Sequence, residues 1–221
     1  MIAHTDTAAA PRKTGKVVLQ TLLGAVTGGL AMSAILWGLH DQEGLLDDPA
    51  RMAALGTAMI YGLMALVVGL GSAAPRVGAQ ALNVEDADEL IEQRPDLLIG
   101  AASFLLVAVL LGALALADGG GVVGILAPKT AGLIAAICAI SLTIMTVAYR
   151  NRGDELMRRV SLEAGSWALA FVCLLFGGWA TLAHLGLAAP FSPLLFVAGV
   201  FALYLLAVFV AAGLRGMMKP R

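Results

Sequence analysis

The sequence predicts an all-α fold: a polytopic membrane helical bundle with six transmembrane helices and both termini cytoplasmic. Three observations predict it. Of the 221 residues, 60% are hydrophobic and only 13% are charged. Six uncharged runs are each long enough to cross a bilayer, and basic residues gather in alternate connections between them. A soluble domain is nearer half apolar and a quarter charged, so the apolar surplus predicts lipid as the solvent.

The first predicted span, 17–39, follows a polar N-terminal tail, 1–16, that carries Arg12, Lys13 and Lys16. Its 23 residues exceed the roughly 7–15 residues of a signal-peptide core, so we interpret it as a retained helix, with cleavage as the alternative. At about 1.5 Å per residue it can cross a hydrocarbon core of about 30 Å.

Five further apolar runs complete a membrane domain over 17–214, and a short tail, 215–221, follows it. Small residues at helical spacing, Gly24 with Gly28 and Ala58 with Gly62, predict close helix crossings, either within the bundle or in a homodimer. The five runs cover 52–74, 97–117, 130–149, 164–183 and 191–214.

The distribution of Lys and Arg predicts the orientation. The N-terminal tail holds three, the second and fourth connections two and four, and the C-terminal tail three, which makes twelve. The other three connections hold only Arg51 and Lys129. Because cytoplasmic connections carry the excess of basic residues, this pattern places both termini in the cytoplasm.

The second connection, 75–96, is acidic. Asp86 and Glu89 are spaced like a capping box and predict a short helix that Pro95 ends or kinks. In the fourth connection, Asp154 is a candidate N-cap, and Glu155, Arg159 and Glu163 share one face of a helix continuous with the fifth span.

These two inner connections hold the candidate interaction site. Their functional interpretation is a docking surface, or an acidic loop that clasps a basic one; the alternative is solvated helix ends, with local ion pairs worth only a few tenths of a kcal/mol each. The Asp-Glu-Leu sequence recurs at Asp88 and at Asp154, which indicates either an internal repeat or a coincidence of composition. The candidate residues are Asp88, Glu89, Arg94, Asp154, Glu155, Arg158, Arg159 and Glu163.

The segments NVEDADEL, residues 83–90, and DELMRRVSLEAG, residues 154–165, resemble segments of six-helix bacterial inner-membrane proteins to which no activity is assigned. The resemblance implies a multi-pass protein of the bacterial cytoplasmic membrane. It implies no site residues.

No catalytic motif stands out, and we predict no catalytic residues, cofactor or metal site. No predicted span has an ionisable residue in its interior, which argues against an ion-coupled transporter. The net charge of −1 gives no basis for a nucleic-acid partner.

The sequence therefore favours a non-enzymatic accessory or interaction subunit that uses loops 75–96 and 150–163. The alternative is a small facilitator or channel with a polar cavity inside the bundle, in which Tyr61 and Tyr204 meet Thr57, Ser141, Thr143 or Thr146. The expected partners are the lipid bilayer, another membrane or cytoplasmic protein, and further copies in a homo-oligomer.

Overall fold

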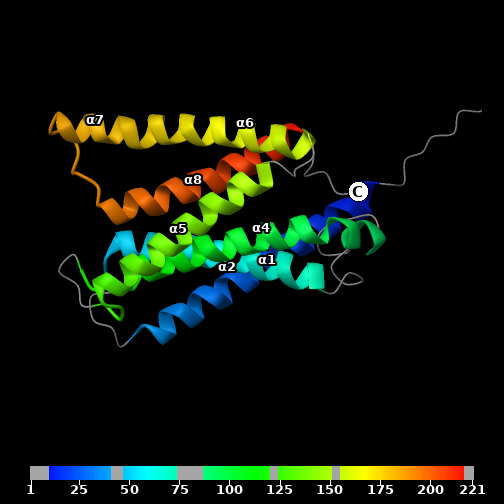
Figure 1. Cartoon of the computed structure of the whole chain (residues 1–221), viewed down its shortest axis with the longest axis horizontal. Coiled ribbons are helices and arrows are strands. Elements are labelled where there is room, and N and C mark those ends of the chain that lie inside the picture. The colour runs from blue at the N-terminus through cyan, green and yellow to red at the C-terminus, as the bar shows by residue number, and fades with distance from the viewer. Residues whose placement is uncertain (1–9, 41–46, 74–86, 120–123, 151–154, 217–221) are drawn as a thin grey trace, which may run out of the picture.

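A computed structural model describes residues 10–40, 47–73, 87–119, 124–150 and 155–216, without the side chains of 10–21, 23, 87–90 and 149–150. Within these ranges the fold is all-helical apart from isolated bridge residues in the connection between α4 and α5, where Ala117 pairs with Leu126 (Figure 1). The elements are α1 (Ala10–Gly38), α2 (Pro49–Ala73), α4 (Ala87–Ala115), α5 (Pro128–Arg150), α6 (Glu155–Val172), the π-helix η1 (Cys173–Gly177), α7 (Gly178–His184) and α8 (Pro193–Leu214).

Five of the described helical stretches are long and apolar enough to cross a membrane: α2, α4 from Ile91, α5, the continuous run α6–η1–α7, and α8. They coincide with five of the predicted spans. The first predicted span, 17–39, lies in α1, whose described apolar part, Gly24–Gly38, is shorter. Large apolar side chains such as Ile137, Ile140 and Ile144 of α5 are more than half exposed, as expected where lipid is the solvent.

The core is the antiparallel pair α2 and α4. Ala54 and Ala58 of α2 and Leu111 of α4 are buried between the helices. A Cβ atom built on Gly62 would lie 3.8 Å from the Cβ of Ala108, and one on Gly69 would lie 3.9 Å from that of Ala101. Because small residues let two helices approach closely, this face forms the tight crossing that Ala58 and Gly62 predicted.

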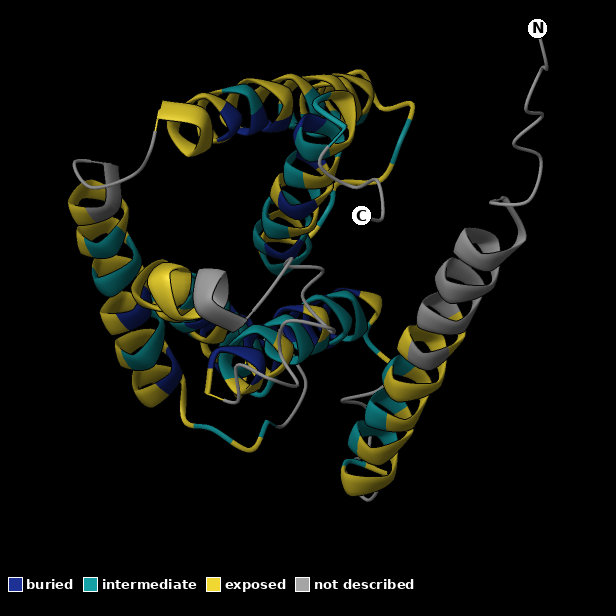
Figure 2. Cartoon of the chain, turned by 90° about the vertical axis from the view of Figure 1, so that its right-hand side faces the viewer, coloured by how far each residue is buried: buried dark blue, intermediate teal, exposed yellow. Residues whose placement is uncertain are grey.

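Helix α8 joins this core to the periphery. Its residues Ala198 and Leu205 belong to the α2–α4 core cluster, while Ala211 on another face packs with Val160 and Ala164 of α6. Helix α6 lies along α8 at the edge of the molecule (Figures 1 and 2). Along the run Glu155–His184, only Val160, Ala164 and Ala168 are buried within the chain.

Helix α1 contacts the bundle near its C-terminal end, where Ile35 and Leu39 pack against the core cluster. In Figure 2 most of α1 stands apart from the other helices. A Cβ atom on Gly24 or Gly28 would meet nothing within 4 Å. The prediction that these glycines make a close crossing within the bundle is therefore wrong; a crossing in a homodimer stays a prediction.

Local signals explain several helix boundaries. Asp48 Oδ1 accepts a hydrogen bond from the Ala50 amide ahead of α2, and Ser192 Oγ accepts one from the Leu195 amide ahead of α8. The alternative that Pro95 ends a short helix is wrong, because α4 starts at Ala87 and continues through Pro95 into its apolar part. The N-terminal parts of α4 and α6 and the C-terminal part of α8 lie at one end of the molecule, here called the inner end (Figure 1).

The π-helix η1 is a feature that the sequence did not predict. It interrupts the fifth span and carries Phe176, whose ring packs edge-on against Phe191 and Phe196 at centroid distances of 5.4 and 5.1 Å. The same ring covers Gly199 of α8, where a Cβ atom would lie 2.2 Å from its Cζ. Contact between η1 and α8 therefore requires glycine at 199.

Substitution Gly199→Ala should lower the free energy of unfolding by about 1–3 kcal/mol, because the added methyl group displaces a ring held by two aromatic neighbours. The measurement is denaturant unfolding of the purified protein in detergent. Gly165→Ala, where a Cβ meets nothing within 4 Å, is the control and should be neutral or stabilising by up to about 1 kcal/mol. Adding Phe176→Leu to Gly199→Ala should recover part of the loss; a loss of the same size without Phe176 would contradict this explanation.

Candidate functional site

The start of α6 forms a charged helical extension ahead of its apolar run. The carboxylate of Glu155 accepts hydrogen bonds from Arg158 Nη2 at 2.7 Å and from Arg159 Nε at 2.9 Å. All three side chains are more than half exposed. The predicted pair of Glu155 with Arg159 is confirmed. Because one carboxylate serves two guanidinium groups, one positive charge is left unneutralised.

Glu163 has a different partner from the one its spacing suggested. It accepts two hydrogen bonds from Arg215, just beyond α8, from Nε at 2.8 Å and from Nη2. This pairing raises the pKa of Arg215 above its ordinary value, mainly through the hydrogen bond to Glu163. The fork-like contact ties the inner end of α6 to that of α8, so Glu163 anchors two helices instead of extending the Glu155–Arg159 stripe.

The start of α4 forms a second charged extension at the same end of the molecule (Figure 1). Glu92, Arg94 and Asp96 are all exposed, ahead of the apolar residues that begin at Leu97. Asp88 and Glu89 lie in the first turn of α4, but their side chains are outside the described part, as is the whole of Asp154.

The predicted clasp between the acidic and the basic loop is not made by the described residues. Each ion pair recorded within 47–73, 87–119 and 155–216 lies inside one helix or its cap, or joins α6 to Arg215. None joins α4 to α6. The described candidate side chains, those of α4 and those of α6, thus form two separate surfaces at one end of the bundle.

One buried structural contact, at the opposite end of the molecule, was not predicted from the sequence. Arg51, in the first turn of α2, is only 4% exposed. Its Nη1 donates to the carbonyl oxygens of Ala115 at 2.9 Å and Ala117 at 2.8 Å, and its Nη2 donates to that of Gly119 at 2.6 Å. Asp48 lies 3.4 Å from its Nε.

This contact closes the outer end of the α2–α4 pair. Carbonyl groups at a helix C-terminus have no partner within the helix and carry partial negative charge, so a guanidinium is well suited to them. The chain after α4 is also fixed by Gly124, where a Cβ would lie 2.2 Å from the carbonyl carbon of Ala117. The sequence signal for the contact was a single arginine in an otherwise apolar first helical turn after Asp48-Pro49.

The hydroxyl groups inside the membrane helices do not converge on a polar cavity. Tyr61, which is 2% exposed, donates to the carbonyl oxygen of Phe201 at 2.8 Å, so it links α2 to α8. Thr57, Thr143 and Thr146 donate to carbonyl oxygens four residues earlier in their own helices. Tyr204 is 44% exposed. Thr143 and Thr146 line a groove beside α5, so the polar cavity expected for a facilitator or channel stays a prediction.

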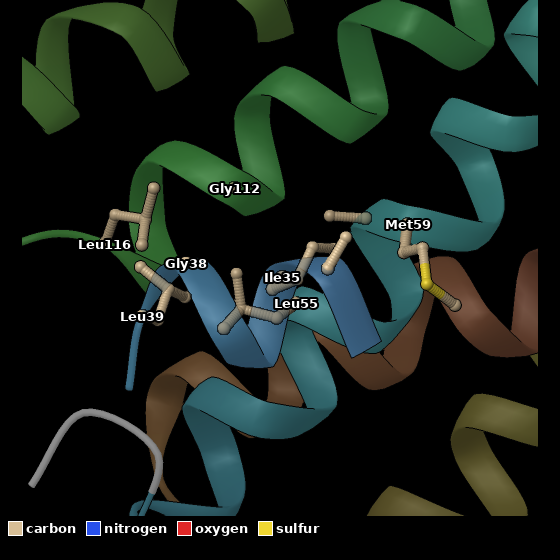
Figure 3. Close-up of a pocket in the computed structure, with 9 residues that line it drawn as sticks. Ile35, Gly38, Leu39, Leu55, Met59, Gly112 and Leu116 are labelled. Carbon is tan, nitrogen blue, oxygen red and sulfur yellow. The ribbon is translucent and has the colours of Figure 1, made fainter. Parts of the chain in front are cut away.

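Grooves lie between the helices. One, of about 430 Å³, opens between α1, α2 and α4, and apart from backbone its lining is apolar; Figure 3 shows Ile35 and Leu39 facing Leu55, Met59 and Leu116 across it. The second, about 400 Å³, lies beside α5 and includes Thr143, Thr146 and Phe201. The first is a surface for apolar contact with lipid or another helix, whereas the second also presents two threonines.

Cys138 is buried and Cys173 is exposed, and both are free thiols. Within the described residues no group of three His, Cys, Asp or Glu side chains could hold a metal ion. Comparison of the chain with protein-family models, with curated proteins and with solved structures gives no match. The contact surfaces described above are therefore inferred from the geometry of this chain alone.

Substitution Arg51→Met should lower the free energy of unfolding by about 3 kcal/mol or more, because three carbonyl oxygens lose charge-assisted hydrogen bonds of roughly 1.5–3 kcal/mol each before water compensates. Arg51→Lys should recover only part of this, because an ammonium group lacks the planar fork. Asp48→Asn, which alters an ion pair with a 34% exposed carboxylate and retains a capping side chain, should cost less than about 1 kcal/mol. Equal losses for Arg51→Met and Asp48→Asn, measured by unfolding in detergent, would disprove the role of the carbonyl contacts.

Proposed function

We propose that this protein is a non-enzymatic integral membrane protein that binds another protein through the charged inner ends of α4 and α6. One observation carries the proposal: both helices extend past their apolar parts as exposed, charged helical turns at the same end of the molecule. Side chains on such helical extensions are held in place by the membrane-embedded helices that continue from them, which gives a partner an ordered surface.

The hydrogen bonds of the polar groups within the membrane helices indicate that these groups have a structural role. Tyr61 and the threonines already have backbone acceptors, so their hydrogen bonds stabilise helices and helix contacts and need no substrate. Glu163 and Arg215 hold α6 against α8, so the exposed charges of Glu155, Arg158 and Arg159 stand on a fixed support. Charge at the rim of an interface mainly sets partner choice and association rate.

Reversal of the two arginines, Arg158→Glu with Arg159→Glu, should remove a co-purifying partner from the full-length protein isolated in mild detergent, because the surface changes from net positive to net negative. The measurement is quantitative mass spectrometry of the eluates. Lys129→Glu, an exposed reversal at the outer end of α5, is the matched control and should keep the partner. Retention of every partner by the double variant would remove the main support for this function.

The proposal includes six spans, with α1 as the first, and both termini in the cytoplasm of a bacterial inner membrane. The twelve-to-two distribution of basic residues supports this orientation, and the five apolar helices support a multi-pass protein.

A fluorescent protein fused after Arg221 should fluoresce, because it would fold in the cytoplasm, and alkaline phosphatase fused after Leu187 should be active, because the turn between α7 and α8 would be outside. The same phosphatase after Arg221 is the control and should be inactive. The opposite activity pattern would show that the orientation is inverted.

A further inference from the structure

The inner end of the molecule carries two surfaces of opposite charge. We define the acidic surface by Glu92 and Asp96 of α4, and the basic surface by Arg158 and Arg159 of α6. The sequence around them extends the contrast: segment 75–96 has six acidic and two basic residues, a net charge of −4. Segments 150–163 and 215–221 together have seven basic and three acidic residues, a net charge of +4.

Neither surface is neutralised by the described part of the chain. Glu92 and Asp96 are exposed, and no ion pair recorded there includes them. Arg158 and Arg159 share the single carboxylate of Glu155 and keep 54% and 65% of their side-chain surfaces exposed. Helix α6 packs on α8 and not on α4, so the fold keeps the two surfaces apart.

Both surfaces lie at the same depth relative to the apolar runs. Glu92 lies five residues before Leu97, where the apolar part of α4 begins, and Arg159 lies five residues before Ala164, where that of α6 begins. A bilayer holds every copy of the chain in one orientation. The acidic surface of one copy and the basic surface of a neighbour are therefore at the same height and can meet by lateral diffusion.

We infer that the partner of each surface is a second copy of this chain: the acidic surface at Glu92 and Asp96 of one copy docks on the basic surface at Arg158 and Arg159 of another. The inference rests on the proposed function and names its partner. Two features support a second copy: the charges match in size and are opposite in sign, and α6 is open to approach, since its residues Leu162 and Leu169 are 66% and 65% exposed. Charge complementarity of this kind favours the matching partner and penalises a like-charged one.

The test uses two full-length copies with different affinity tags, produced in one cell and purified through the first tag in mild detergent at low salt. Wild-type copies should co-purify. Arg158→Glu with Arg159→Glu in both copies should reduce co-purification roughly tenfold, the factor that two or three lost exposed ion pairs correspond to. Raising the salt concentration to about 1 M, where the screening length falls to about 3 Å, should reduce co-purification of the wild-type copies in the same way.

The decisive arm exchanges the charges. A copy with Arg158→Glu and Arg159→Glu should co-purify with a copy carrying Glu92→Arg and Asp96→Arg, because each meets an opposite charge in the other. Neither variant should co-purify with a second copy of itself. Lys129→Glu should leave wild-type association intact, and monodisperse gel filtration of each variant shows that it has folded.

Failure of the exchanged pair to associate would overturn the inference. So would co-purification that stays at the wild-type level in every charge-reversed variant. These outcomes differ from failure of the proposed function. If a different protein co-purifies with the wild type and is lost with Arg158→Glu and Arg159→Glu, while tagged copies never associate, the proposed function stands and the second copy is excluded. If neither a different protein nor a second copy depends on these arginines, both fail.

Discussion

The close antiparallel pairing of α2 and α4 is the contact on which the rest of the structure depends. Alanine and glycine on both helices remove side-chain bulk, so the backbones approach until Gly62 and Ala108 nearly touch. In lipid there is little hydrophobic driving force for apolar helices to associate, so van der Waals packing at this distance supplies much of the attraction. Arg51 then fixes the outer ends of the pair. Helix α8 is attached to this pair through Tyr61 and the apolar core cluster, and α6 is attached only through α8.

This order of attachment explains where the molecule can offer contacts. A helix held on both sides has little free surface, whereas α6 is held along one face by Val160, Ala164 and the Glu163–Arg215 pair. Its remaining surface is open from the charged inner turns to the aromatic cluster around Phe176. The basic residues proposed for binding, Arg158 and Arg159, therefore lie on a helix that the fold leaves accessible along one side.

Apolar length predicted the helical class and five helices long and apolar enough to cross a membrane, because within a bilayer a helix satisfies all of its backbone hydrogen bonds internally. Helical spacing also predicted the pair Glu155–Arg159 and the crossing at Ala58 and Gly62, since both depend on residues of one helix face. The roles of Glu163 and Arg51 depend on partners 52 and 64 or more residues away. Spacing along one helix carries no information about such contacts, so the local pattern suggested the wrong partner for Glu163 and none for Arg51.

The two glycine motifs differ because only one of them faces a neighbouring helix. Gly62 and Gly24 have equivalent small residues four positions away, yet only Gly62 faces a neighbouring helix in the chain. A small-residue pair permits close approach but does not supply the opposing helix; α4 offers a matching row of small residues at Ala101 and Ala108, whereas α1 diverges before any helix of the bundle reaches Gly24. Charge behaves in the same way at the inner end: the acidic residues of α4 and the arginines of α6 permit an attraction, but the fold holds them on different helices. Complementary groups that the fold holds apart within one chain can still bind each other between two chains. The membrane favours this contact, because it holds both groups at the same height.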